Sequence, residues 1–267
     1  MTPSVFDGLR ELAHEHAGIA MRPGKEALVT ARLAPRLRAL GLADERAYLA
    51  HVRGAFRDEG NTSPEVTAFL DALATNVTSF FREPEHFEVL AEHVTGLLAQ
   101  GSRRLRVWSA ACSTGQEPLT IAMVLEDLLA SSGIDWRVLA TDLSTTALAR
   151  ARRCRYTFDE VSAIPAELRE RHLTHAEDGW RPGAHLAGRI NVERLNLART
   201  PYPLNGPIDV VFCRNVFIYL SRPTKQRLVR EIERVLRPGG LFMIGHSETL
   251  HGLETSLRAV QPSVYVK

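Results

Sequence analysis

The first 75 residues carry apolar positions at helical spacing and show no strand-like alternation. Apolar residues recur every three or four positions over residues 6–19 (FDGLRELAHEHAGI), which predicts an amphipathic helix. A second helix is predicted over 24–40, and further helices around 45–56 and over 64–73. This part of the chain therefore predicts an all-α domain.

From residue 105 the pattern changes to short buried strands that alternate with helical stretches. RLRVW, WRVLATD, IDVVF and LFMIG are apolar runs of strand length, and the tail SLRAVQPSVYVK indicates a terminal strand. Helical patterns such as EPLTIAMVLEDLL, STTALARARR and RPTKQRLVREIERV lie between them. This alternation favours a mostly parallel, Rossmann-like sheet that is covered on both faces, and hence the α/β class.

The pattern breaks between about residues 156 and 197. Turn signals at Asp178-Gly179 and Pro182-Gly183 separate short β-prone pieces there, which predicts a small antiparallel insertion or an edge ribbon. We therefore expect a helical domain over 1–75, a connecting segment over 76–104, and an α/β domain over 105–267.

Composition narrows the class of protein without naming a function. The chain has 267 residues, of which 45% are hydrophobic and 24% are charged, and its formal net charge is +2. The apolar fraction excludes wholesale disorder, and the near-zero charge gives no argument for nucleic-acid binding. No apolar run reaches about 18 residues, so we expect no membrane insertion. The acids and histidines of the first 16 residues are also unlike a signal peptide.

Two features of the α/β part point to a nucleotide-like cofactor. Small residues in SAACSTGQEP follow the first strand, and such a turn lets backbone N–H groups approach a ligand. Asp142 ends the second strand, 27 positions after Gly115, where an acid can accept hydrogen bonds from ribose hydroxyls. An ordinary strand-to-helix turn, and a helix cap by Asp142 or Ser144, remain alternatives. NAD enzymes have the same pattern of strands, helices and a strand-end acid.

Two further segments place polar groups among apolar ones. TNVTSFFRE, residues 75–83, surrounds an aromatic pair with polar side chains, although a helix boundary with a packed arginine would look the same. FCRNVFIYL places Arg214 and Asn215 after a buried strand, and Tyr219 four positions later. At the carboxyl end of a parallel strand such groups face the ligand crevice, whereas a structural asparagine is the alternative.

Several other signals are weak. The ten histidines form no HExxH pattern, so no metal site is predicted. GHSE, residues 245–248, does not complete the G-x-S-x-G pattern of a serine nucleophile. Cys112, Cys154 and Cys213 lack CxxC spacing, and they indicate reduced thiols in a cytoplasmic protein.

Taken together, these segments resemble the CheR family of chemotaxis-receptor glutamate methyltransferases. The resemblance covers about residues 6–267 and rests on TNVTSFFREPEHF, VWSAACSTGQEP, ATDLS, NVERLNL, FCRNVFIYL and LRPGGLFMIGHSE in this order. It implies a class I S-adenosylmethionine methyltransferase fold, with an all-α N-terminal domain and a small antiparallel β insertion. Val77 and Gln116 depart from the glutamates that many relatives have there, which puts local tuning of the site in doubt.

The resemblance also implies the site. S-adenosyl-L-methionine would be the methyl donor, S-adenosyl-L-homocysteine the product, and no metal would be needed. Arg82 and Tyr219 would face the methyl-transfer site. The implied cofactor contacts are Asn76, Thr78, Arg82, Glu117, Asp142, Asn196, Leu197, Arg214 and Asn215.

The implied reaction is methyl transfer to the γ-carboxylate of receptor glutamates. A solvated glutamate has a pKa of about 4.3 and is ionised at pH 7, so no general base is required. Catalysis would then rest on positioning and on exclusion of water, with Arg82 orienting the carboxylate. A regulatory module that only binds the cofactor, and a methyltransferase of another signalling system, are the alternatives.

The helix over 24–40 is a candidate docking surface for the acidic helical part of a chemoreceptor. Arg32 and Arg36 lie one turn apart and share a face, and Arg38 adds to the local positive charge. A solvated helix face would have the same pattern. The β insertion is a second candidate, because some family members grip a receptor C-terminal peptide there by strand addition. We expect a cytoplasmic monomer.

Overall fold

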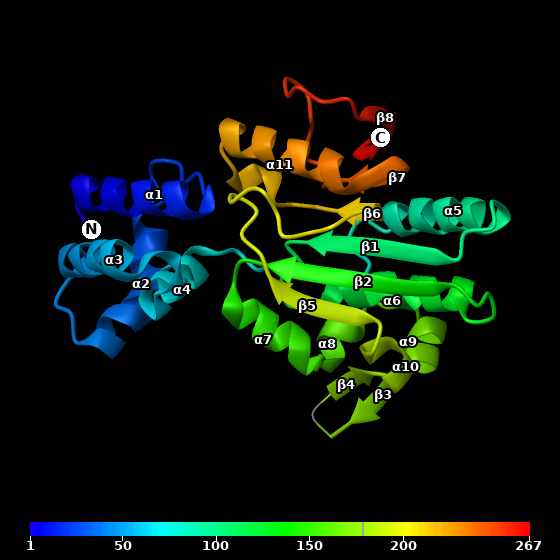
Figure 1. The fold of residues 1–267 in the computed structure, drawn as a ribbon. Coiled ribbons are helices and arrows are strands. Elements are labelled where there is room, and N and C mark those ends of the chain that lie inside the picture. Colours follow the sequence, from blue (N-terminus) through cyan, green and yellow to red (C-terminus); the bar gives the residue numbers. More distant parts are fainter. Residues whose placement is uncertain (178) are drawn as a thin grey trace.

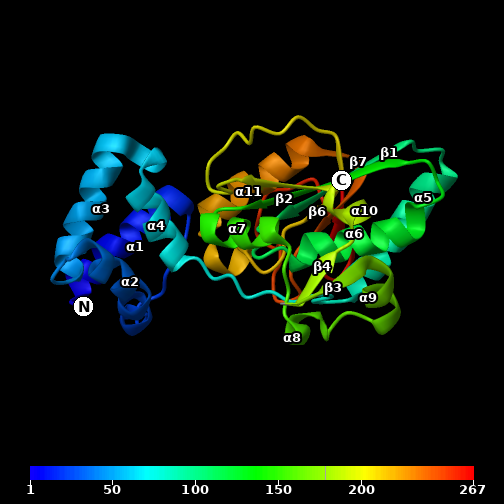
Figure 2. The same cartoon turned by 90° about the horizontal axis from the view of Figure 1, so that it is seen from below.

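The computed structural model describes residues 1–177 and 179–267, so Asp178 of the predicted turn lies outside the described residues. A lobe of helices stands beside an α/β lobe, and the arrowheads of β1 and β2 point toward the helical lobe (Figure 1). Seen from below, one extended segment follows the last helix of the helical lobe into the α/β lobe (Figure 2). In the described residues no helix is both long enough and apolar enough to cross a bilayer.

The N-terminal lobe confirms the predicted all-α domain. Phe6, Leu9, Leu33, Tyr48 and Phe69 are among the buried side chains of its core. The helices end or begin at ordinary signals: Gly18 and Gly41 adopt left-handed conformations at helix C-termini, and the Asp44 carboxylate accepts a hydrogen bond from Ala47 N at 2.8 Å. The elements are α1 (Pro3–Ala17), α2 (Glu26–Leu40), α3 (Glu45–Glu59), the short 3₁₀ turn η1 (Gly60–Thr62) and α4 (Pro64–Leu73).

The α/β lobe contains a mostly parallel sheet, as predicted. In the described part of the chain it has seven strands in the order β5-β2-β1-β6-β7-β9-β8, of which β9 pairs antiparallel with β7 and β8. The chain runs outward from β1 to β5 on one side and from β6 to β8 on the other. Ligands of such sheets bind at this reversal, outside the carboxyl ends of the strands. The strands are β1 (Arg104–Ala110), β2 (Asp135–Asp142), β5 (Ile190–Arg194), β6 (Ile208–Phe212), β7 (Leu236–Met243), β8 (Arg258–Gln261) and β9 (Val264–Val266).

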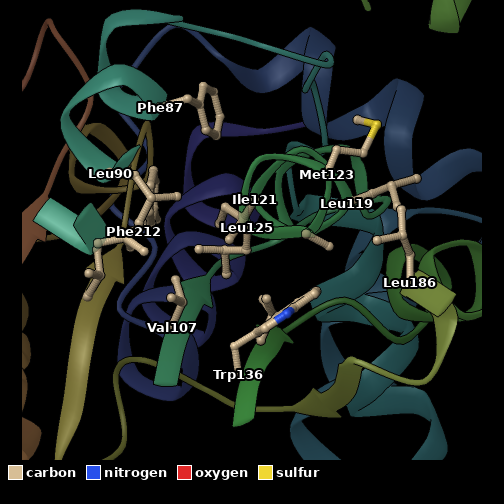
Figure 3. Close-up of a cluster of buried hydrophobic side chains, with 14 of the residues drawn as sticks. Phe87, Leu90, Val107, Leu119, Ile121, Met123, Leu125, Trp136, Leu186 and Phe212 are labelled. Carbon is tan, nitrogen blue, oxygen red and sulfur yellow. The ribbon is translucent and has the colours of Figure 1, made fainter. Parts of the chain in front are cut away.

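Helices cover both faces of the sheet. On one face α5 (Glu85–Ala99) and α6 (Gln116–Leu129) pack on side chains such as Val107, Trp136 and Phe212 (Figure 3). α7 (Thr145–Arg153) packs over Ala140 and Val192 near the β5 edge. On the opposite face α11 (Arg222–Val235) buries Leu228 and Ile232 against Val211 and Phe242. Both layers leave the carboxyl ends of the strands open toward the helical lobe.

The insertion is smaller than the predicted span of 156–197. Its antiparallel pair is β3 (Leu173–Ala176) with β4 (Gly179–Pro182), flanked by α8 (Phe158–Val161), α9 (Ala166–His172) and α10 (Ala184–Ala187). β5 falls within the predicted span but pairs parallel with β2, so it belongs to the large sheet.

Two other expectations differ from the structure. The segment 76–104 is not a plain linker, because α5 lies within it and buries Phe87, Leu90 and Val94 in the main core. The tail forms two strands, β8 and β9, instead of one, because a turn at Pro262 and Ser263 folds it into a hairpin.

Candidate functional site

A cleft lies between the two lobes, at the carboxyl ends of β1, β2 and β6. It holds about 770 Å³ of empty space, counting its open mouth. Ala17, Ile19 and Leu73 of the helical lobe form one wall, and Asp142 and Arg214 are among the α/β residues that face them. Both domains are therefore needed to complete this cavity.

Asp142 is held in the cleft wall as a hydrogen-bond acceptor. Its Oδ2 accepts from Ser113 N at 2.8 Å, and its Oδ1 accepts from Ser144 N at 2.9 Å. Burial raises the pKa of this carboxyl above its ordinary value, although those backbone N–H groups act against the rise. Each carboxylate oxygen has a second lone pair, so the group can also accept from the two hydroxyls of a ribose. The cap of α7 is Ser144, which accepts from Ala147 N at 3.1 Å.

The loop after β5 contributes Asn196 and Leu197 to the same wall. Asn196 Nδ2 donates to the His16 carbonyl of the helical lobe at 2.7 Å, and its Oδ1 accepts from Ala198 N at 3.0 Å. Leu197 is buried and supplies an apolar surface. Asn196 thus joins the lobes, and a contact of either residue with an adenine remains a prediction.

Arg214 and Glu117 form a buried ion pair behind the cleft. Arg214 Nε lies 2.8 Å from Glu117 Oε2, and the Arg214 side chain is only 2% exposed. Ser109 Oγ donates to the other Glu117 oxygen at 2.6 Å. The guanidinium lies over the rings of Phe87 and Phe212, at 5.2 Å and 5.7 Å from their centroids. Arg214 lines the cleft, whereas Glu117 does not line it and holds the Arg214 side chain in position through the ion pair.

Two carboxylates that the sequence analysis missed hold the loop after β6. Glu248 accepts from Asn215 N at 2.9 Å, from Ile218 N at 3.2 Å and from Gly245 N at 2.7 Å. Burial raises the pKa of Glu248, although these N–H groups oppose the rise. Glu248 is the last residue of GHSE, so that motif supports a loop and is not a fragment of a nucleophile turn.

Glu83 is the second of these carboxylates. Its Oε1 accepts from Asn215 Nδ2 at 3.2 Å, and Asn215 has a left-handed φ of 58°. Burial would raise the pKa of Glu83, but the hydrogen bonds from Asn215 and the His246 backbone, with the Arg214 charge, lower it overall. Gly245 is required here, because a Cβ on it would lie 2.4 Å from Asn215 Nδ2. The signal for both acids was their place inside the quoted motifs, because Glu83 ends TNVTSFFRE just before α5 and Glu248 ends GHSE in the turn after β7.

The residues predicted to face the reacting groups lie at different places. Tyr219 lines the cleft, and its carbonyl accepts from Ala20 N of the helical lobe at 2.7 Å. Arg82 is not among the lining residues, and its Nη1 donates to the Val77 carbonyl at 3.1 Å. Their catalytic roles remain predictions.

The segment before Arg82 joins the cleft through its first residue. Asn76 lines the cleft, and its carbonyl accepts from Ser113 Oγ at 2.9 Å. Thr78 is half-buried and, like Arg82, is absent from the lining.

The three arginines predicted to dock a receptor differ in their surroundings. Arg32 donates to the Leu73 carbonyl at 2.7 Å, so it ties α2 to the end of α4. Arg36 forms an ion pair with Glu65, which also accepts from Tyr48 Oη at 2.7 Å. Arg38 is exposed. The positive charge of α2 is thus partly used within the lobe, and docking there stays a prediction.

One group of side chains has the spacing of metal ligands. Glu83, His86 and His246 could each offer an atom to one ion. Arg214 Nη1 already donates to His86 Nδ1 at 3.0 Å and lies 3.4 Å from Glu83 Oε2. A guanidinium at this position repels a cation, so the group is better described as a hydrogen-bonded support of Arg214.

The parallel sheet with one antiparallel strand, and the acid at the tip of β2 in the cleft, fit the class of S-adenosylmethionine-dependent methyltransferases with a Rossmann-like fold. Residues 76–266 match the family model described as CheR methyltransferase, SAM binding domain. Residues 4–74 match the CheR methyltransferase, all-alpha domain. The chain therefore belongs to the CheR methyltransferase family.

Curated relatives agree with this assignment over nearly the whole length. A chemotaxis protein methyltransferase of Escherichia coli (strain K12) is 37% identical over 264 residues, which cover 97% of this chain and 89% of the relative. Its namesake in Salmonella typhimurium is 38% identical, covering 95% of this chain and 87% of the relative. Chemotaxis protein methyltransferase 2 of Pseudomonas aeruginosa is 36% identical, covering 97% and 91%.

Proposed function

We propose that this protein transfers a methyl group from S-adenosylmethionine to the γ-carboxylate of glutamyl side chains in the cytoplasmic helical part of chemoreceptors. The product would be a glutamate methyl ester, and the process sensory adaptation. Family membership supports the methyl transfer and its link with chemotaxis. The carboxylate acceptor is argued from the chemistry of the cleft.

The observation that carries the acceptor is the set of titratable groups around the cavity. Among the described lining residues these are Asp142, Arg214 and Tyr219. Asp142 is engaged by backbone N–H groups, and Arg214 is paired with Glu117. Neither of these two groups is placed to act as a general base. An acceptor that arrives already ionised, as a glutamate does at pH 7, fits such a site.

The chemical types of the residues that line the cleft match the parts of S-adenosylmethionine. The Asp142 carboxylate would accept hydrogen bonds from the ribose hydroxyls, and Leu197 with Leu143 would cover an apolar face of the base. When bound, S-adenosylmethionine supplies a methyl group on a positively charged sulfur. Arg214 stays fixed by Glu117 and the rings beneath it, so the wall would not rearrange during the reaction.

The remaining task of the chain is to orient the acceptor and exclude water. Tyr219 lies in the cleft wall, where its hydroxyl would meet an incoming carboxylate. Arg82 donates one N–H to the Val77 carbonyl, and a fork of five donors leaves others for a carboxylate oxygen. We propose that Arg82 orients the substrate once it binds, and that the helical lobe keeps water from the cleft.

The test is transfer of labelled methyl from the donor to a receptor cytoplasmic fragment. We expect a product label that mild base releases, and none on a fragment in which the accepting glutamates are replaced by glutamines. Binding of S-adenosylhomocysteine without any transfer would instead identify a regulatory module. Transfer to another signalling protein, but not to receptor fragments, would identify a different substrate class.

An Arg82→Ala variant tests the orienting role within the same assay. Turnover should be lost, while affinity for S-adenosylhomocysteine should fall only in part, because Arg82 does not line the cleft. Near-normal ester formation by this variant would rule out the role.

A further inference from the structure

The contacts between the two lobes lie next to residues of the cleft. Asn196 Nδ2 donates to the His16 carbonyl, and Ala20 N donates to the Tyr219 carbonyl, each at 2.7 Å. Asn196 and Tyr219 both line the cavity. A third contact joins Asp71 of α4 to the start of α7, directly after the strand that ends in Asp142. The position of the helical lobe and the shape of the cleft are therefore coupled by neighbouring residues.

Asp71 makes the densest of these contacts. Its Oδ1 accepts from Thr145 N at 2.9 Å. Its Oδ2 accepts from Thr145 Oγ1 at 2.6 Å, from Thr146 N at 3.1 Å and from Thr146 Oγ1 at 3.0 Å. The first N–H groups of a helix lack partners within it, and its N-terminus carries partial positive charge. An aspartate from the other lobe thus satisfies the first turn of α7.

The first turn of α7, which Asp71 holds, follows closely after Asp142, the acid of the proposed cofactor site. Ser144 N, next to Thr145, donates to Asp142 Oδ1 at 2.9 Å. Leu143, which lies between Asp142 and Ser144 in the sequence, packs against the core of the helical lobe and also lines the cleft. Arg194 reinforces the same joint, since it donates to the Leu143 carbonyl at 3.4 Å and to Thr67 Oγ1 of α4 at 3.2 Å. The backbone that presents the Asp142 carboxylate is held from both lobes.

We propose that Asp71 is a positioning residue that fastens the helical lobe onto α7 and so sets the affinity of the cleft for the nucleoside part of the cofactor. This inference rests on the proposed cofactor site, and it adds that the contact of Asp71 with α7 holds the helical lobe against that site. Coupling between two equilibria is reciprocal. A bound nucleoside must therefore tighten the contact between the lobes by the same factor by which the contact tightens its binding.

The experiment compares Asp71→Asn with a matched control, Asp44→Asn. Both aspartates accept from backbone N–H groups at the start of a helix, but Asp44 caps α3 within its own lobe. An asparagine at 71 would offer one acceptor oxygen and would turn an N–H₂ toward the remaining donors. Binding of S-adenosylhomocysteine to the full chain is measured by titration calorimetry, and thermal unfolding is recorded for each variant.

We expect Asp71→Asn to weaken binding by about tenfold, within the usual range of coupling between sites. Asp44→Asn should leave affinity unchanged, because Asp44 caps α3 within its own lobe and an asparagine caps a helix about as well. In the methyl-transfer assay Asp71→Asn should raise the KM for the donor, with kcat within about twofold of the unchanged protein. Thr146→Val, which removes one donor, should show a smaller loss in the same direction.

Limited proteolysis of residues 74–80 gives a readout that needs no activity. Asp71→Asn should be cut faster there than Asp44→Asn, and S-adenosylhomocysteine should protect it less than it protects the unchanged chain. Unchanged affinity in Asp71→Asn, or equal losses in both variants, would overturn the inference. If the unchanged chain bound no S-adenosylhomocysteine, the proposed cofactor site would be refuted. In that case the proteolysis result would still test the role of Asp71, because equal cleavage of the two variants would refute its part in holding the lobes together.

Discussion

His86 should make the stability of this protein fall in mildly acidic solution. Its ring is buried, with Nδ1 accepting from Arg214 Nη1 at 3.0 Å and Nε2 lying 2.7 Å from Ser263 Oγ. A guanidinium can only donate, so Nδ1 must be the acceptor and the proton must sit on Nε2. The ring is therefore neutral in the folded protein. Burial, and then the charge of Arg214, lower the pKa of His86 to about 4.

The size and sign of the effect follow from the two pKa values. In the unfolded chain His86 would titrate near its ordinary pKa of about 6.5. The contribution of the neutral ring is complete above about pH 6.5 and is lost as the pH falls toward 4, since only the unfolded chain then takes up the proton. The loss amounts to about 2 kcal/mol at pH 5 and about 3 kcal/mol below pH 4.

The assay is urea unfolding at intervals between pH 8 and pH 5, for the unchanged protein and for His86→Gln. A glutamine keeps one acceptor and one donor but does not titrate, so the difference between the two proteins isolates His86 from the other histidines. His51→Gln, at an exposed site, is the matched control and should follow the unchanged protein. Parallel curves for the unchanged protein and His86→Gln would refute the reasoning.

Three further outcomes follow from the site and the docking helix. Asp142→Asn should weaken S-adenosylhomocysteine binding by about tenfold or more in calorimetry, because hydrogen bonds to a charged group are lost. Glu248→Gln should lower the free energy of unfolding by about 1–3 kcal/mol in urea, since an amide cannot accept from all three backbone N–H groups. Arg36→Glu should cost about 1–2 kcal/mol, because it faces Glu65, whereas Arg38→Glu should change stability by less than about 0.5 kcal/mol and weaken receptor binding in a co-sedimentation assay.

Most of the fold could be predicted from local patterns of apolar and polar residues. The alternation of buried strands and helices after residue 105 predicted the parallel sheet, and the period of residues 6–19 predicted the first helix. The helix α5 was missed although Phe87, Leu90 and Val94 have helical spacing, because the polar residues before it were read as a linker. The sequence could not divide residues 156–197 between a separate hairpin, here β3 and β4, and an edge strand of the large sheet, here β5. A β-prone segment has the same pattern in either place.

The site was predictable where a polar residue ends a buried strand. Asp142 ends β2 and Arg214 follows β6, and both line the cleft. Glu83 and Glu248 were not predicted as supports, because their partner Asn215 is 132 positions from the first and 33 from the second. Arg36 shows the same limit on α2: a helical pattern gives the face of a side chain but not the neighbour, here Glu65, that packs against it.

The burial of the thiols decides how this enzyme can be tagged for optical work. Cys112 and Cys213 lie inside the core, and burial raises the pKa of both, as well as that of the partly covered Cys154. Thiols of this kind react slowly with maleimides near neutral pH, because the thiolate is the reacting form. A single cysteine introduced on the outer surface of α2 would thus carry a fluorophore selectively, with all native cysteines kept.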